Sequence, residues 1–241
     1  MQKKWGFIMS YDTKKLIREG MVAGSPLILG YFPIAMAFGL LAKNTGLTIT
    51  DTSATSLLVY AGASQFMFLD LLRTGVSAGS IILATFLLNL RHMMMSASLS
   101  VNLKKDTAGF LPIIGFGITD ETFSVLSFNR DKLSLPFILT VNLIAYGAWA
   151  SGTAVGYMVG EVIPRALQDS LGLGLYAMFA ALLFPSFKAD RDYLKPALLG
   201  AATYFAIFKT GLLSSGWDII AGIVIASALG VVAMGKEDKD E

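Results

Sequence analysis

The sequence predicts an all-α integral membrane protein, a polytopic bundle of about eight transmembrane helices. Three observations predict it. Hydrophobic residues make up 54% of the 241 residues and charged residues only 15%, whereas ordinary globular chains carry roughly 25% charged residues. The mean hydropathy is +0.63. The hydrophobic residues also form long continuous runs, unlike the alternating segments of about ten residues typical of a transmembrane β-barrel.

Runs of about 20 apolar residues mark the candidate transmembrane helices. They cover residues 21–42, 53–72, 76–101, 109–129, 134–160, 171–187, 195–213 and 217–235. The sixth run is short and the fifth is long, so seven helices is the alternative count.

These runs predict three regions: a polar N-terminal segment (1–20), a transmembrane bundle (21–235) and a polar tail (236–241). The first run is long enough to span a membrane, so we expect it to be retained rather than cleaved as a signal. Most lysines and arginines outside the runs lie in the N-terminal segment, the tail and alternate loops. Because positively charged loops face the cytoplasm, both termini are expected there.

The composition excludes several functions. Without cysteine, disulfides, iron–sulfur clusters and thiol catalysis are excluded, and a single histidine leaves too few ligands for a zinc site. The net charge of +2 is too small to indicate nucleic-acid binding. An intramembrane aspartyl protease needs carboxylates on two helices, whereas Asp120 and Glu121 share one run. We therefore expect no enzyme activity, no metal and no cofactor.

The first run contains two prolines and several glycines. Pro26 and Pro33 each remove an intrahelical donor and clash with the preceding turn, so we predict a first helix broken by Pro and Gly. The break is either a kink packed against neighbours or a discontinuity that lines a ligand site. In the second case the lining residues are Ser25, Pro26, Gly30 and Pro33.

The second run carries the sequence YAGASQF (60–66). Its candidate binding residues are Tyr60, Gly62, Ala63, Ser64 and Gln65. One interpretation is a tight helix–helix seam in which Gln65 is a hydrogen-bonding residue. The other is a locally opened helix that binds a zwitterion with its backbone and with Ser64 and Gln65.

The third run carries LNLRH (88–92), with Arg91 about halfway along it. A guanidinium at mid-bilayer costs at least about 2.5–3.5 kcal/mol, so Arg91 must meet a carboxylate, carbonyls, water or an anionic ligand. Asn89 and Arg91 are about 160° apart on a regular helix. Either the helix unwinds here, or Arg91 serves a different neighbour from Asn89. His92 is a candidate for a proton relay or a plain hydrogen-bonding residue.

The fourth run carries TDETF (119–123) near its middle. Two adjacent carboxylates in a low dielectric are not expected to stay charged and unpaired. One of Asp120 and Glu121 can pair with Arg91, and the other is either a proton carrier or part of a water-filled vestibule. In the fifth run Asn142, Tyr146 and Trp149 share one helical face, for packing or for walling an apolar pocket.

Two pairs of segments are similar at offsets near 117 residues. Residues 24–41 are similar to 142–159, and residues 57–68 are similar to 173–184. Many secondary transporters are built from such repeats, although glycine-rich apolar helices also look alike by chance.

The motifs together resemble the AzlC family, the large subunit of bacterial branched-chain amino acid exporters that was first linked to azaleucine resistance. The resemblance lies in GSPLILGYFPIAMAFG (24–39), YAGASQF (60–66), LNLRH (88–92), TDETF (119–123) and WASGTAVGYMVG (149–160). It implies export of leucine, isoleucine, valine and methionine across a bacterial cytoplasmic membrane. It also implies a small membrane partner of the AzlD type.

Three hypotheses follow for function: a gradient-driven exporter working by alternating access, a passive channel, and a non-transporting assembly subunit. The sequence holds no GxxxxGK[ST] nucleotide-binding motif. Uphill transport would therefore draw on an ion gradient or on a separate ATPase.

Overall fold

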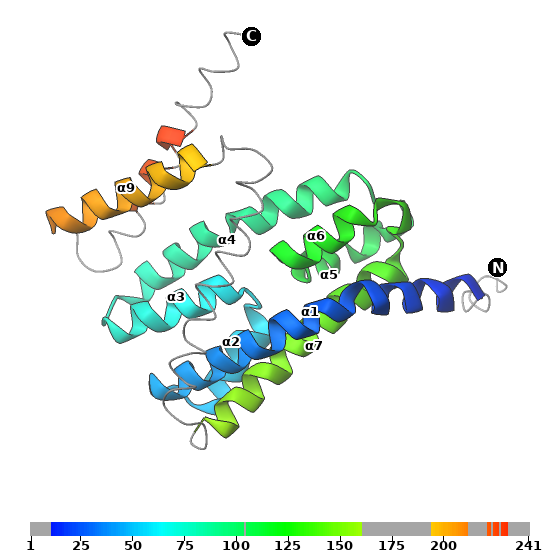
Figure 1. Ribbon diagram of the computed structural model, residues 1–241, viewed down its shortest axis with the longest axis horizontal. Coiled ribbons are helices and arrows are strands. Elements are labelled where there is room, and N and C mark those ends of the chain that lie inside the picture. The colour runs from blue at the N-terminus through cyan, green and yellow to red at the C-terminus, as the bar shows by residue number, and fades with distance from the viewer. Residues whose placement is uncertain are drawn as a thin grey trace, which may run out of the picture. The chain divides into compact units, whose positions relative to one another are not determined.

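The all-α prediction is confirmed, since the part of the chain that the structure describes contains helices and turns and no strand (Figure 1). This computed structural model describes residues 11–103, 105–160, 194–211, 221–222, 224–226 and 228–230. The named elements are α1 (Tyr11–Asn44), α2 (Ile49–Leu58), α3 (Gly62–Arg73), α4 (Ala78–Ser100), η1 (Lys105–Phe110), α5 (Leu111–Phe116), α6 (Asp120–Phe128), η2 (Arg130–Lys132), α7 (Leu135–Val159) and α9 (Leu194–Thr210).

Within the residues that the structure describes, three helical segments are long and apolar enough to cross a membrane. They are Thr13–Asn44, Ala78–Ser100 and Leu135–Val159. The count of eight stays a prediction, because run 171–187 lies outside the described residues and run 217–235 is described only in part.

The chain forms two compact units. The first comprises Met1–Gln65 and Asn89–Gly172, and the second comprises Phe66–Leu88 and Leu173–Glu241. In the second unit, Leu71 of α3 and Ala84 of α4 form a small apolar cluster. The same unit contains α9, which lies within the predicted run 195–213 apart from its first residue, Leu194. The polar residues of the candidate site described below belong to the first unit.

α1 and α7 lie side by side and run in the same direction (Figure 1). Near their starts Gly20 faces Phe137 and Thr140, and near their ends Gly39 faces Thr153. A Cβ added to Gly156 would lie 2.1 Å from the Met36 carbonyl oxygen, so the two backbones are in contact there. This is the small-residue packing that membrane helices use to approach closely.

The pairing of α1 with α7 joins the two segments of the first predicted repeat, 24–41 and 142–159. The offset between facing residues in the structure is close to the offset between the similar sequences. The second pair includes 173–184, which lies outside the described residues. The internal repeat therefore stays a prediction.

The discontinuity predicted as one alternative for the first helix is wrong, and the other alternative, a kink packed against neighbours, stays a prediction. α1 is a continuous helix of 34 residues that contains both Pro26 and Pro33. The missing N–H of Pro26 leaves the Val22 carbonyl without its helical donor, and the Ser25 hydroxyl donates to that carbonyl at 3.0 Å. Close packing along α7 then holds the helix together across its prolines.

Two other runs are interrupted instead. Run 53–72 is divided into α2 and α3 at residues 59–61, and run 109–129 is divided at residues 117–119, where α5 ends and α6 begins. Tyr60, in the first interruption, has a φ of 45°, a left-handed conformation that costs energy for a bulky residue. In the second, the Asn142 amide lies where a Cβ of Gly117 would be, so only glycine fits.

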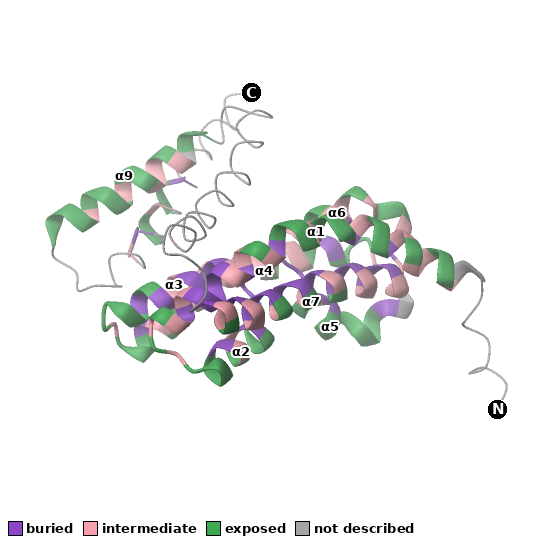
Figure 2. Ribbon diagram, turned by 60° about the horizontal axis from the view of Figure 1, so that its bottom comes forward, coloured by how far each residue is buried: buried purple, intermediate pink, exposed green. Residues whose placement is uncertain are grey.

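The core of the first unit packs α4, α5 and α6 against α7. Its buried residues are Leu99, Ile114, Ile118, Leu126, Leu133, Phe137, Ile138 and Val141. Figure 2 shows buried residues concentrated along α7. Large apolar side chains such as Leu29, Phe86 and Leu143 are exposed, as expected where helices face lipid.

We predict that Gly156→Ala destabilises the protein and that Gly147→Ala does not. Both glycines lie on α7, but a Cβ meets the α1 backbone at Gly156 and open space at Gly147. Overpacking of this kind costs about 1–3 kcal/mol. Thermal unfolding of the purified variants in detergent measures the difference. Equal melting temperatures for the two variants would contradict the described contact between α1 and α7.

Candidate functional site

The two interruptions meet at a cluster of three aromatic rings. Tyr60 lies in the first interruption, Phe116 ends α5, and Tyr146 comes from α7. Their ring centroids are 5.9 Å apart for Tyr60 and Phe116, and 5.0 Å apart for Tyr60 and Tyr146. Three segments far apart in the chain are thus brought together: the first interruption, the end of α5 just before the second interruption, and α7.

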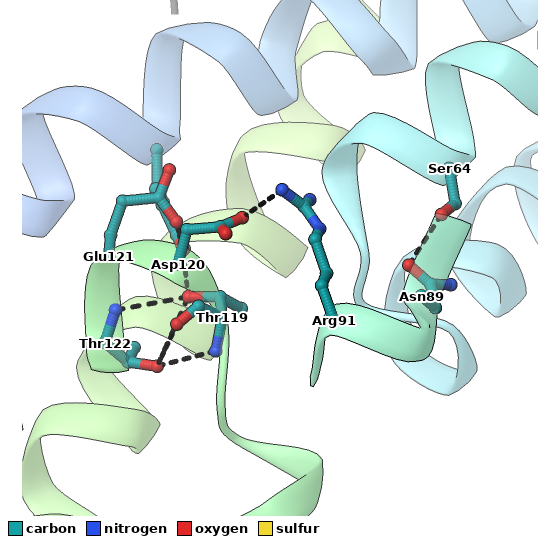
Figure 3. Close-up of polar contacts among 8 residues, drawn as sticks. Ser64, Asn89, Arg91, Thr119, Asp120, Glu121 and Thr122 are labelled. Atoms are coloured by element: carbon teal, nitrogen blue, oxygen red, sulfur yellow. Dashed lines mark hydrogen bonds and ion pairs between the residues drawn. The ribbon is translucent and has the colours of Figure 1, made fainter. Parts of the chain in front are cut away.

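The start of α6 is fixed by a reciprocal cap (Figure 3). The Thr119 hydroxyl accepts from the Thr122 N–H at 3.2 Å, and the Thr122 hydroxyl accepts from the Thr119 N–H at 2.8 Å. Asp120 and Glu121 therefore occupy the first turn of a helix. The helix dipole stabilises negative charge in the first turn, and it therefore favours two acids at this position of the helix.

Arg91 of α4 and Asp120 of α6 form an ion pair, with 2.7 Å between Nη1 and Oδ2 (Figure 3). Their side chains are 35% and 26% exposed, so the pair borders accessible space. Arg91 Nε is buried and has no hydrogen-bond partner among the described residues. The guanidinium thus keeps one donor that no described residue uses.

Glu121 has a different partner from its neighbour. The Tyr31 hydroxyl of α1 donates to Glu121 Oε2 at 2.6 Å and lies 2.5 Å from the Thr119 hydroxyl. Because a hydroxyl has one hydrogen to donate, the Thr119 hydroxyl donates to Tyr31 and Tyr31 donates to Glu121. The two adjacent acids therefore have different partners: Asp120 pairs with the cation of Arg91, and Glu121 accepts from the neutral hydroxyl of Tyr31.

One face of α7 holds the helices that are interrupted. Asn142 Nδ2 donates to the Ile114 carbonyl of α5 at 3.3 Å, and Tyr146 donates to the Leu57 carbonyl of α2 at 2.9 Å. Trp149 Nε1 donates to Gln65 Oε1 at 2.9 Å. The predicted face of Asn142, Tyr146 and Trp149 therefore anchors both segments.

In the YAGASQF segment the helix is opened and Gln65 is a hydrogen-bonding residue, while zwitterion binding stays a prediction. The helix is open at residues 59–61, whereas Gln65 is buried, and its amide also donates to the Ser56 hydroxyl at 2.9 Å. Gly62 allows the Trp149 ring to approach, since a Cβ there would lie 2.7 Å from it. Ala63 is buried beside them.

Asn89 and Arg91 contact different neighbours, as one of the two sequence alternatives required. Asn89 Oδ1 accepts from the Ser64 hydroxyl at 2.7 Å, while Arg91 pairs with Asp120. α4 stays regular through both residues. The 160° between them on the helix is the reason for the separate partners.

The remaining candidates lie apart from these contacts. Ser25, Pro26, Gly30 and Pro33 are on the exposed face of α1. His92 is partly buried and forms no hydrogen bond or ion pair within the described part of the chain. In the same part, no group of three His, Asp or Glu side chains is arranged to hold a metal ion.

Sequence reasoning missed Tyr31, Thr119 and Thr122. A threonine just before two acids is a helix-start signal, and it could have placed the start of α6 at residue 120. Nothing local marks Tyr31, because its role depends on which helix faces α1.

These features define the class: a helical membrane protein with two interrupted segments meeting beside a partly exposed ion pair. The comparisons with known proteins give the family. The model of the AzlC protein family matches residues 26–163, which include Tyr31, Arg91 and both acids. The chain belongs to the AzlC family.

Relatives cover most of the chain. An uncharacterized membrane protein of Archaeoglobus fulgidus is 33% identical over 91% of this chain and 94% of its own. Inner membrane protein YgaZ of Escherichia coli is 29% identical over 86% of each chain. An uncharacterized membrane protein of Helicobacter pylori is 30% identical over 83% of this chain and 89% of its own. No solved structure matches the chain.

We predict that Arg91→Gln and Asp120→Asn each lower the melting temperature, and that the double variant is no less stable than the worse single variant. Each single change leaves one charge unpaired, whereas the double change leaves none. The double-mutant cycle should give a coupling of at least about 0.5 kcal/mol. Asp70→Asn is the matched control, since Asp70 is exposed on α3. Strictly additive effects would show that the two side chains do not interact.

Proposed function

We propose that the protein exports branched-chain amino acids, namely leucine, isoleucine and valine, together with methionine, by gradient-driven alternating access. One observation carries the proposal: two interrupted helices meet beside the Arg91–Asp120 pair inside a membrane protein. Interrupted helices that present backbone groups to a ligand are typical of secondary transporters. No enzyme activity is proposed.

A zwitterionic amino acid carries one negative and one positive group, which are complementary to the charges of Arg91 and Asp120. Its carboxylate can bind the guanidinium of Arg91, where Nε is unused, and its ammonium can bind Asp120. One ion pair is then exchanged for two, so neither protein charge is left alone. The first N–H groups of α3, which begins at Gly62, are further donors for the carboxylate, since a helix start has no intrahelical acceptors for them.

The apolar side chain of the substrate would lie against the aromatic cluster. Phe116 and Tyr146 of that cluster also line a cavity of about 360 Å³, with Ile113, Leu139, Asn142 and Leu143. Most of this lining is apolar and can make van der Waals contacts with a branched aliphatic side chain. It has no charge that would favour a charged side chain.

Glu121 is the proposed proton carrier. Asp120 is engaged by Arg91, whereas Glu121 is held by the neutral hydroxyl of Tyr31. Tyr31 can donate to the carboxylate form, and it can accept from the acid form after its hydroxyl turns. His92, next to Arg91 in sequence, is the alternative relay.

The assembly and location belong to the same proposal. A small AzlD-type membrane subunit would be the protein partner, and both termini would lie in the cytoplasm of a bacterial cell. The name of YgaZ, an inner membrane protein, supports the cytoplasmic membrane as the location.

Efflux of labelled leucine from proteoliposomes under an imposed pH gradient tests the proposal, with and without the small subunit. We expect Arg91→Gln and Asp120→Asn to reduce leucine efflux at least about tenfold, which corresponds to about 1.4 kcal/mol of lost substrate binding. Glu121→Gln should keep leucine exchange between the two sides but lose acceleration by the gradient. Gln can still accept from Tyr31, so that variant changes charge more than structure.

Asp70→Asn is again the control and should export normally. Flux that grows linearly with leucine and never saturates would indicate a passive channel instead. An absence of flux with every substrate, with or without the partner, would favour an assembly subunit. Normal gradient-driven export by Glu121→Gln would remove the coupling step while leaving transport intact.

A further inference from the structure

A charged cavity lies near the start of α1, and neither of the two interruptions, 59–61 and 117–119, contributes a residue to its lining. It has a volume of about 520 Å³ and is lined by Lys15, Arg18, Glu19, Val22, Asn129 and Lys132, with Ala23 beside them. Three cations and one carboxylate leave this cavity with a positive net charge. Its residues come from two segments more than a hundred positions apart in the chain.

The carboxylate holds the lysines in place. Glu19 Oε2 lies 3.2 Å from Lys132 Nζ, and Glu19 Oε1 lies 4.0 Å from Lys15 Nζ. Arg18 is exposed and forms no ion pair within the described residues. The cavity therefore has two ammonium groups paired with Glu19 and one guanidinium that no described residue pairs with. The planar fork of that guanidinium suits a phosphate.

The cavity lies at the expected level of lipid headgroups. The candidate span Thr13–Asn44 has 32 residues and is about 48 Å long at 1.5 Å per residue, whereas the hydrocarbon core is about 30 Å thick. Its apolar part begins at Met21, so residues 15–19 extend beyond the core. Lys132 precedes α7, which runs parallel to α1 and starts at the same membrane surface.

We propose that this cavity binds the phosphate of an anionic phospholipid headgroup. The cations contact the phosphate, and the exposed side chain of Val22 continues toward the bilayer, where an acyl chain lies. A free phosphate is also an anion, but it has no acyl chain that could lie against the apolar part of the lining. The site is independent of the proposed transport.

Binding of phosphatidylglycerol to the purified full-length protein in neutral detergent tests the site, read by native mass spectrometry and by melting temperature. Phosphatidylcholine and inorganic phosphate are the comparison ligands. We expect phosphatidylglycerol to bind and stabilise the protein, and Arg18→Gln to weaken that binding about fivefold. Lys132→Gln should weaken it similarly. Lys14→Gln should not, because Lys14 is exposed on the same helix but outside the cavity.

The Arg18 change is the main variant because it breaks no ion pair, so a folding defect is not expected. Equal binding of both phospholipids would overturn the proposal, as would equal losses in Arg18→Gln and Lys14→Gln. Stabilisation by inorganic phosphate equal to that by phosphatidylglycerol would assign the cavity to free phosphate and overturn the lipid assignment.

Discussion

Backbone contact between α1 and α7 is the constraint on which the rest of the first unit depends. Glycines at 39, 152 and 156 let the two helices touch, and that contact fixes which side chains can reach the interruptions. Tyr31 then reaches α6 from α1, while Asn142, Tyr146 and Trp149 reach α5, α2 and α3 from α7. α7 donates hydrogen bonds to backbone carbonyls of both interrupted segments, which need such partners where no water is available, and α1 adds a side-chain contact at the start of α6. The continuous pair thus makes the discontinuous segments possible.

The charged groups follow from the same arrangement. An arginine within a membrane needs an acid or water, and the cap at Thr119 places Asp120 where it meets Arg91. A fully buried pair would be a poor place for a solute, because desolvation penalises any exchange of partners. Here both side chains keep about a third to a quarter of their surface exposed, and the adjacent Glu121 is held separately by Tyr31. Two acids on one helical turn therefore have different chemical partners.

Hydropathy predicted the class and the positions of five consecutive runs from residue 21 to residue 160, but not which of them are continuous. It measures how apolar a segment is, and a chain can stop being helical for three residues without becoming less apolar. Prolines were the wrong guide in α1, where the Ser25 hydroxyl replaces the lost donor. Glycine and threonine marked the real interruption at 117–119, which the apolar pattern concealed. Arg91 and the two acids could be found from the sequence because charged residues are rare within apolar runs. The role of Tyr31 depends on helix packing, and no local sequence pattern marks it.

The shared direction of α1 and α7 constrains the topology of everything between them. If both helices cross the membrane from the same surface, the chain from residue 45 to 134 must make a net return, which requires an odd number of crossings. α4, the candidate span between them, accounts for one. The segments α2–α3 and α5–α6 must then contribute an even number together. The topologies of the two segments are therefore linked: either both cross the bilayer or both turn back at their interruptions. Finding on which membrane side a tag placed at the end of one segment is accessible would decide the topology of both.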